Sequence, residues 1–453
     1  MTSSFLVSAS NPTGKKRRIE LPGTDLWIMD RIDNVFVYPA NLNVDQLKEA
    51  LDRALCLWPL IAGRFLLLDG DRYVIEMSDN SIPLSLVENT DLPKWPFDSK
   101  VVVDLRYHTL EPFVDEVPIH KLLRGSSEEP LIRLKLTRLV QSGECILGIS
   151  WAHVLGDAMS CLCFLTTVSR IYQRLKPLEP FPIFERRLWD DSKANQSLLN
   201  VMKPLRDGGP AEQMFQAIMD EQMTHDQLNL HFTGEQLIKL RMLAGDNCVT
   251  IQDALTAYII RTLNVHCFQD DDHHRILRTD TAVNFRGVAD SIAPQGLIAN
   301  AVLMMLSDDF DDPYSLENIA KTIRRSIIKS RDANFLETWL ATADRLMRRM
   351  AREERMANIC HSANEIVVNS NLRYDWANLV DFGHTDQCRF HTVWTGVLYL
   401  RVFHLNPVFD STRWITQDRN GAEVAFLLET KAKEKFMNAW KNDVNNNFAD
   451  VDK

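Results

Sequence analysis

Two neighbouring strand patterns that lead straight into a helix pattern constrain the fold more than any other part of this sequence. In LIRLKLTRL (131–139), Ile and Leu alternate with Arg, Lys and Thr, which is typical of a half-buried strand. The run ECILGISWA (144–152) is apolar on both faces, as expected of a central strand. From Ala158 onward, apolar residues recur at helical spacing. We therefore expect an antiparallel strand pair that delivers the chain to a strand-to-helix junction at 153–157.

The junction, HVLGD, places His153 and Asp157 four residues apart with Gly156 between them. An imidazole titrates near neutral pH, so His153 is suited to remove a proton from an alcohol or an amine. The alternative is a core histidine at the end of a strand. Asp157 could hold the tautomer of His153 or fix the loop through a cation, and an acid at a helix start is also stabilised by the helix dipole. The residues themselves leave these alternatives open.

The rest of the chain is organised in two halves that both mix strand and helix patterns. At 453 residues the chain exceeds the size at which one core stops growing, so two domains are expected. The stretch 176–209 is first proline-rich and then polar, as in a connection between domains. We predict an N-terminal domain at 1–190, a connection at 191–228 and a C-terminal domain at 229–453.

Composition narrows the possible partners and the compartment. The net charge of −10 argues against a nucleic acid or an anionic membrane as the main partner. The eight cysteines are scattered without a CxxC pair, as in a protein with free thiols from a reducing compartment. No uncharged run is long enough to span a membrane, and the basic cluster KKRR (15–18) follows the first apolar residues rather than preceding them, unlike a secretory signal. We expect a monomeric cytoplasmic protein.

Several common site motifs are missing. The sequence has no GxGxxG after a strand pattern, no GxxxxGK[ST] and no GxSxG, so dinucleotide, P-loop and serine-hydrolase sites are not indicated. The run DDDHHR (270–275) could bind a metal loosely, but it lacks a spaced partner ligand. We expect it to be a solvated loop and predict no metal site.

The junction resembles the HxxxD motif of the BAHD acyltransferases, relatives of condensation domains and of chloramphenicol acetyltransferase. Other stretches resemble the family's remaining motifs in the family's order. They are LPGTDLWIM (21–29), LDRALCLWPLIAGRF (51–65), IQDALTAYIIR (251–261), TAVNFRG (281–287) followed by APQGLIANAV (293–302), and VDFGHTD (380–386). In the first of them Asp25 stands where the family's N-terminal segment has an Asp. Together these stretches extend over most of the chain.

The resemblance implies an α/β fold of two similar chloramphenicol-acetyltransferase-like domains, with mixed sheets flanked by helices and an active-site channel at their interface. It also implies acyl-CoA as cosubstrate, with no tightly bound cofactor. The implied reaction moves an acyl group, acetyl or another short one, to a hydroxyl of a small specialised metabolite. The alternatives are an amine acceptor, a carrier-bound thioester as in condensation enzymes, and a relative that only binds.

The resemblance also assigns roles to residues. His153 would be the general base, and Asp157 would be structural, turned from His153 and paired with Arg286. In the DFG-type loop, Gly383 and His384 would be candidate donors to the oxyanion of the tetrahedral intermediate.

Two further assignments follow the same resemblance. Asp381 would hold the DFG-type loop together, and Asn300 would contact the cofactor. The sequence departs from the family at His384, where the family has Trp, and at Ala299, where the family has the Gly before Asn.

Overall fold

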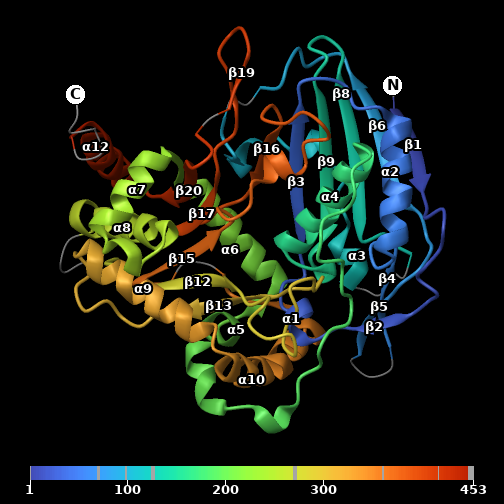
Figure 1. The fold of residues 1–453 in the computed structure, drawn as a ribbon. Helices are drawn as coiled ribbons and strands as arrows, with labels where there is room; N and C mark the ends of the chain where they lie inside the picture. The colour runs from blue at the N-terminus through green and yellow to red at the C-terminus, as the bar shows by residue number, and fades with distance from the viewer. Residues whose placement is uncertain are drawn as a thin grey trace.

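The computed structural model consists of two large mixed sheets that stand side by side, with helices packed against them (Figure 1). It describes residues 2–68, 72–96, 99–123, 128–268, 273–359, 362–416 and 418–446. This arrangement agrees with the predicted α/β fold of mixed sheets flanked by helices.

The first sheet has seven strands in the spatial order β1 (Thr2–Val7), β6 (Ile82–Asn89), β8 (Ile132–Leu139), β9 (Cys145–Ala152), β3 (Arg31–Tyr38), β16 (Arg389–Val393) and β7 (Val102–Val103). The predicted antiparallel pair is present as β8 and β9, with Ile132 opposite Trp151. Every residue of β9 is buried, because strands lie on both sides of it and helices cover one of its faces.

The second sheet has six strands in the order β11 (Asp226–Phe232), β20 (Ala422–Leu428), β17 (Tyr399–His404), β15 (Glu365–Ser370), β12 (Arg278–Asn284) and β13 (Val302–Leu306). β12, β15 and β17 are parallel to one another, and the other pairings are antiparallel. The remaining described strands form three smaller sheets. One contains β2 (Arg18–Glu20), β5 (Tyr73–Glu76) and β4 (Arg64–Leu67), a second β10 (Gly209–Pro210) and β14 (Arg355–Met356), and a third β18 (Val408–Phe409) and β19 (Trp414–Ile415). β4 and β5 pair antiparallel, and residues 69–71 between them lie outside the described residues.

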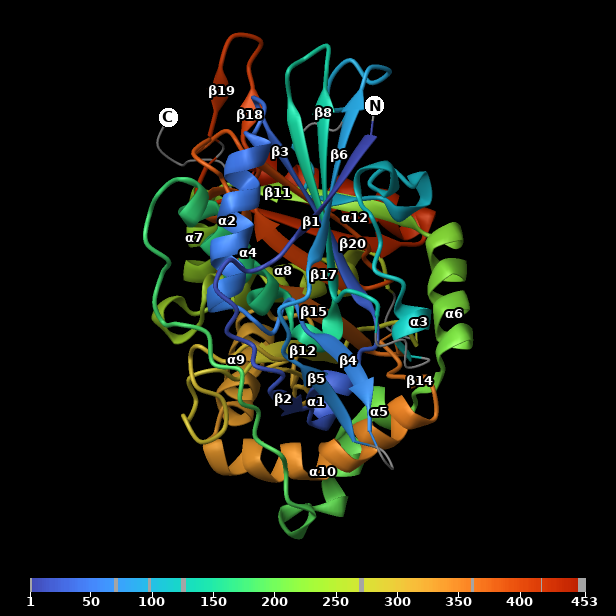
Figure 2. The same ribbon diagram turned by 90° about the vertical axis from the view of Figure 1, so that its right-hand side faces the viewer.

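Helices α2 (Val44–Leu57) and α4 (Ala158–Tyr172) run side by side over the first sheet (Figure 1). Helices α7 (Gly234–Leu243), α8 (Ile251–His266), α9 (Leu316–Ser330) and α12 (Thr430–Asn446) pack in the layer beside the second sheet. Figure 2 shows α10 (Ala333–Arg352) across one end of the molecule and α6 (Ala211–Thr224) along one side. The short helices are α1 (Gly23–Leu26), α3 (Ile119–Leu123), α5 (Lys203–Arg206) and α11 (Trp376–Leu379).

Local capping explains where several of these helices begin. Asn43 accepts a hydrogen bond from the Gln46 amide at the start of α2, and Thr233 forms a capping box with Gln236 before α7. These side chains satisfy backbone N–H groups that have no partner within the helix. Both caps were predicted from the sequence.

Strands and helices of the structure cross the predicted domain limits in two places. β16, which lies inside the predicted domain 229–453, pairs with β3 and β7 and is therefore a strand of the first sheet. The predicted connection at 191–228 contains α5, β10 and α6, and β11 of the second sheet already begins at Asp226. The second half of the chain thus contributes to both sheets, because the antiparallel partner of β3 comes from far along the sequence.

Among the described residues, no helix is long and apolar enough to cross a lipid bilayer. The seven described cysteines form no disulfide.

Candidate active site

The HVLGD junction lies where the end of β9 meets the second sheet. A short 3-10 turn, η3 (His153–Leu155), follows β9, and α4 begins at Ala158. Gly156 has φ 149° and ψ 173°, and a Cβ at this position would lie 2.5 Å from Ser160 Oγ and 3.1 Å from the backbone nitrogen of Ala299. Only glycine combines this backbone conformation with such a close approach. Gly156 therefore allows the chain to turn sharply between His153 and Asp157.

The ring of His153 is oriented by Asn300. His153 is half-buried, its backbone N–H donates to the carbonyl oxygen of Asp30 at 2.8 Å, and its Nδ1 lies 2.9 Å from Asn300 Oδ1. Asn300 Nδ2 donates to the His153 carbonyl oxygen at 2.8 Å, and this contact fixes which end of the amide faces the ring. Since Asn300 Oδ1 can only accept, the proton of the neutral ring is on Nδ1 and the lone pair is on Nε2.

Asp157 is turned away from the His153 ring and holds Arg286. Arg286 Nη1 donates to Asp157 Oδ2 at 2.7 Å and Arg286 Nη2 donates to Oδ1 at 3.0 Å, in a two-point contact. Asp157 also accepts from the backbone amides of Ser160 and Ala301, at 3.1 Å each. The Asp157–Arg286 pair implied by the family resemblance is therefore present, and both carboxylate oxygens are occupied.

The pair is almost fully buried: Asp157 is 5% exposed and Arg286 is 4% exposed. Burial alone would raise the pKa of Asp157, but the charge of Arg286 and the hydrogen bonds from Arg286, Ser160 and Ala301 outweigh it, so the pKa lies below its ordinary value. Asp157 is thus an ionised carboxylate paired with Arg286, and it carries no proton that it could give to a substrate.

A second buried ion pair supports Asn300 from the other side. The Asn300 backbone N–H donates to Asp25 Oδ1 at 2.7 Å, and Arg186 Nε donates to Asp25 Oδ2 at 2.7 Å. Arg186 also donates to the carbonyl oxygen of Leu155 at 3.1 Å. Burial raises the pKa of Asp25, and the charge of Arg186 acts in the opposite direction.

Sequence reasoning missed Arg186, because it follows a proline-rich stretch that was interpreted as a connection with few contacts. That interpretation is wrong at this position, since the side chain is buried against Asp25. Sequence reasoning also missed Asp30, which lies close enough to His153 to interact with its charge. Burial raises the pKa of the Asp30 carboxyl, and the backbone hydrogen bond and the charge of Arg31 act in the opposite direction.

The DFG-type loop lies at the opposite end of α4 from His153. A Cβ placed on Gly383 would be 3.7 Å from Oε1 of Gln173, which follows the last residue of α4. Because α4 has 15 residues, its ends are about 22 Å apart at 1.5 Å per residue. The backbone N–H groups of Gly383 and His384 already donate to Asp381, at 3.0 Å and 2.8 Å. Both backbone N–H groups are therefore used within the loop, and the role of Gly383 and His384 as oxyanion donors stays a prediction.

The loop instead packs against the first half of the chain. Asp381 Oδ1 accepts from Gln173 Nε2 at 2.9 Å as well as from Gly383, so Asp381 ties the loop to α4. The ring of His384 lies 6.0 Å from that of Tyr38, and burial lowers the pKa of His384. The Tyr38 hydroxyl donates to the carbonyl oxygen of Val380.

Within the described ranges, no cluster of three or more His, Cys, Asp or Glu side chains could hold a metal ion. The first residues of the DDDHHR loop, 270–272, lie outside these ranges.

Comparison with known proteins places this geometry in a family. A family model described as the Transferase family matches residues 104–438. The chain belongs to this family, the BAHD acyltransferases. Phenolic glucoside malonyltransferase 1 of Bemisia tabaci is 27% identical over 232 residues, which cover 45% of this chain and 48% of the relative. Rosmarinate synthase of Plectranthus scutellarioides is 28% identical over 197 residues, which cover 40% of this chain and 43% of the relative.

The chain thus spans less than half the length of these two curated relatives, whereas solved BAHD-like structures match nearly all of it. Vinorine synthase has a TM-score of 0.61 at 14% identity, with 96% of both chains covered. F. graminearum TRI101 complexed with ethyl coenzyme A has a TM-score of 0.65 at 12% identity, with 94% of this chain and 98% of TRI101 covered. At these identities the likeness concerns the fold, and it confirms the predicted chloramphenicol-acetyltransferase-like architecture.

We predict that the Asp157–Arg286 pair of this BAHD chain is a stability element. Asp157→Asn leaves the buried guanidinium without its counter-charge, so the free energy of unfolding at pH 7 should fall by about 3–5 kcal/mol. The folded-state pKa of Asp157 is lowered, so its contribution is present above the unfolded-state pKa and is lost as the pH falls through the folded-state value. Urea unfolding of both proteins at pH 7 and in acid measures this difference, which should shrink in acid.

The matched control is Glu49→Gln, which removes one partner of the exposed Arg174–Glu49 pair and should leave the urea midpoint almost unchanged. Equal midpoints for wild type and Asp157→Asn at pH 7 would contradict the assignment.

Proposed function

We propose that this BAHD chain is an acyl-CoA-dependent O-acyltransferase that transfers an acyl group, acetyl or another short one, to a hydroxyl of a small specialised metabolite. The orientation of His153 carries the proposal: with its Nδ1 proton donated to Asn300, the ring presents Nε2 as a base. The names of similar proteins support it, since one is a malonyltransferase and structures of TRI101 are complexed with coenzyme A and T-2 mycotoxin or deoxynivalenol.

In the proposed reaction His153 is the only residue that takes up and releases a proton. His153 Nε2 takes the proton of the acceptor hydroxyl, and the hydroxyl oxygen forms a bond to the carbonyl carbon of the acyl-CoA thioester. The tetrahedral intermediate collapses when the carbon–sulfur bond breaks. The CoA sulfur receives the proton from the imidazolium, and the ester leaves with free CoA-SH. Asn300 accepts the Nδ1 hydrogen throughout, and the buried Asp157 takes no part in proton transfer.

We also propose that the enzyme is a cytoplasmic monomer. It uses acyl-CoA as a cosubstrate and has no tightly bound cofactor. The free thiols of the described cysteines suit a reducing compartment. Multiple-turnover assays with free acyl-CoA and an alcohol pool, followed by mass, test the reaction. Transfer that requires a carrier-bound thioester, or that modifies only amines, would contradict the proposal.

We predict that His153→Ala abolishes most turnover. Loss of a general base lowers the rate by about 10²–10⁴-fold, so kcat should fall by that factor. The half-buried ring is not part of either buried ion pair, so the melting temperature and CoA binding should stay close to wild type. The control is His108→Ala, at an exposed position paired with Glu111. Full activity of His153→Ala would exclude it as the base.

We also predict that Asn300 positions His153 rather than the cofactor. Asn300→Ala removes the acceptor of the Nδ1 hydrogen, so the ring can rotate or change tautomer, and kcat should fall by about 10²-fold. The KM for acyl-CoA should stay within twofold, roughly, because the change acts on the orientation of the base. A raised KM at unchanged kcat would instead support the cofactor contact first expected for Asn300.

A further inference from the structure

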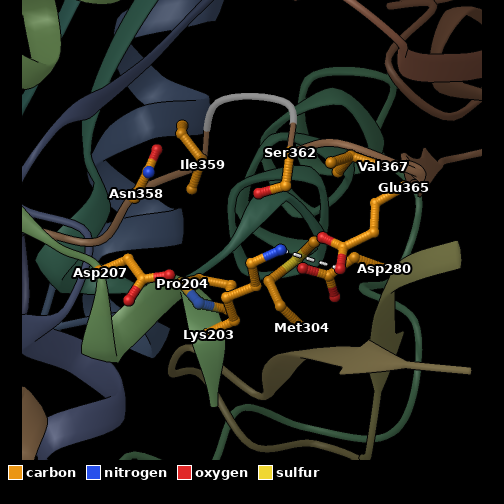
Figure 3. Close-up of a pocket in the computed structure, with 10 residues that line it drawn as sticks. All are labelled: Lys203, Pro204, Asp207, Asp280, Met304, Asn358, Ile359, Ser362, Glu365 and Val367. Carbon is orange, nitrogen blue, oxygen red and sulfur yellow. Dashed lines mark hydrogen bonds and ion pairs between the residues drawn. The ribbon is translucent and has the colours of Figure 1, made fainter. Parts of the chain in front are cut away.

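A polar pocket lies on the face of the second sheet that is directed toward the first sheet. Asp280 of β12 stands beside Val367 of β15, and Val367 stands beside Tyr399 of β17. Glu423 belongs to the same face through its register with β17, and its carboxylate accepts from the backbone amides at Val101 and Val102 beside the first sheet. Its lining includes Asp280 of β12 and Glu365, the first residue of β15 (Figure 3).

The charge of one carboxylate in this pocket is already balanced. Lys203 Nζ lies 3.0 Å from Glu365 Oε1, and the two side chains meet inside the pocket (Figure 3). Arg278 Nε lies 3.9 Å from the same oxygen. Asp207 at the rim is bound by the guanidinium of Arg206.

Among the described residues Asp280 has no salt-bridge partner, although Lys203 lies near enough for its charge to act on the carboxylate. Asp280 is 6% exposed, and its Oδ1 is buried without a hydrogen bond within the described part of the chain. Its carboxylate lies near the Lys203–Glu365 pair in the pocket lining (Figure 3). Burial raises the pKa of Asp280 to about 7, the charge of Glu365 acts in the same direction, and the charge of Lys203 acts against both. A buried polar atom without a partner is costly, and a ligand that supplies a charged donor would remove the cost.

The pocket shares none of its lining residues with the HxxxD site. Arg286, which binds Asp157, lies six residues after Asp280 and beyond the end of β12. At about 3.3 Å per residue of extended chain, the two positions are at most roughly 20 Å apart.

The chemistry of the lining selects one class of ligand. Lys203 and Arg206 pair with Glu365 and Asp207, so Asp280 is the lining carboxylate that has no ion-pair partner among the described residues, and it disfavours a phosphate or another anion beside it. No set of three metal ligands occurs in the described residues, and apolar side chains form part of the wall. Met304, Ile359 and Val367 suit a short hydrocarbon stem, while Asp280 suits a positive end group.

We propose that this pocket binds the protonated amine of an organic ligand, with Asp280 as its ion-pair partner and the methylene groups of the ligand against Met304 and Val367. None of the pocket residues is assigned to the HxxxD site, so binding of the amine can be tested without acyl-CoA.

Calorimetric titration of the full chain with n-butylammonium chloride, at low ionic strength and pH 8, tests the proposal. We expect saturable binding to wild type and at least about tenfold weaker binding to Asp280→Asn, which keeps the shape and removes the charge. Asp308→Asn, an exposed Asp outside the pocket lining, is the matched control and should bind like wild type. Neutral n-butanol should not bind. No binding to wild type, or equal binding to Asp280→Asn, overturns the proposal.

A second variant keeps the test informative if Asp280→Asn fails to fold. Lys203→Met removes the cation that balances Glu365, so n-butylammonium should bind more tightly than to wild type. Binding should also strengthen between pH 6 and pH 8 in wild type, because Asp280 must be ionised to pair with the amine. Unchanged or weaker binding in Lys203→Met, or affinity independent of pH, contradicts the role of the pocket carboxylates. Competition by Ca²⁺ at equal ionic strength would show a metal site instead.

Discussion

The buried ion pair between Asp157 and Arg286 is the contact on which the arrangement of the site depends. Asp157 caps α4, which covers the first sheet, and Arg286 follows the last residue of β12 in the second sheet. A buried charge without its partner is strongly unfavourable, so the two residues must stay together once the chain has folded. The pair therefore joins the two sheets directly beneath His153. It also removes Asp157 from the chemistry, because both of its oxygens are occupied.

This separation of roles leaves the orientation of His153 to Asn300. An amide suits the task, since it accepts from the ring with its oxygen and donates to the His153 carbonyl with its nitrogen. Asn300 is itself anchored through its backbone to Asp25, whose charge Arg186 balances. Two acids in one buried region repel each other, and Asp157 indeed contributes to the raised pKa of Asp25. Each acid therefore needs its own arginine, and the two arginines come from different parts of the chain.

The parts of this arrangement that the sequence predicts are those that depend on local pattern. The alternation in 131–139 and the apolar run in 144–152 predict β8 and β9 because side chains alternate across a strand. His153 and its junction follow from the same local pattern, and Asp157–Arg286 followed from the resemblance to known motifs. The membership of β16 in the first sheet could not be predicted in this way, since its partner β3 lies about 350 residues earlier and periodicity carries no pairing information. The burial of Arg186 against Asp25 escaped prediction for the same reason.

The DFG-type loop shows why a motif can be distant from the chemistry and still matter to it. Helix α4 carries Asp157 at its N-terminal end, where Arg286 holds it, and Gln173 at its C-terminal end, where Asp381 holds it. Both holding residues come from the second half of the chain, as does β16, which follows the loop and enters the first sheet. A helix fixed at both ends cannot shift along its axis without breaking a buried or half-buried contact. His153 precedes α4, so under the proposed function these two contacts would hold the helix that follows the base, and the DFG-type loop would bear on His153 through α4.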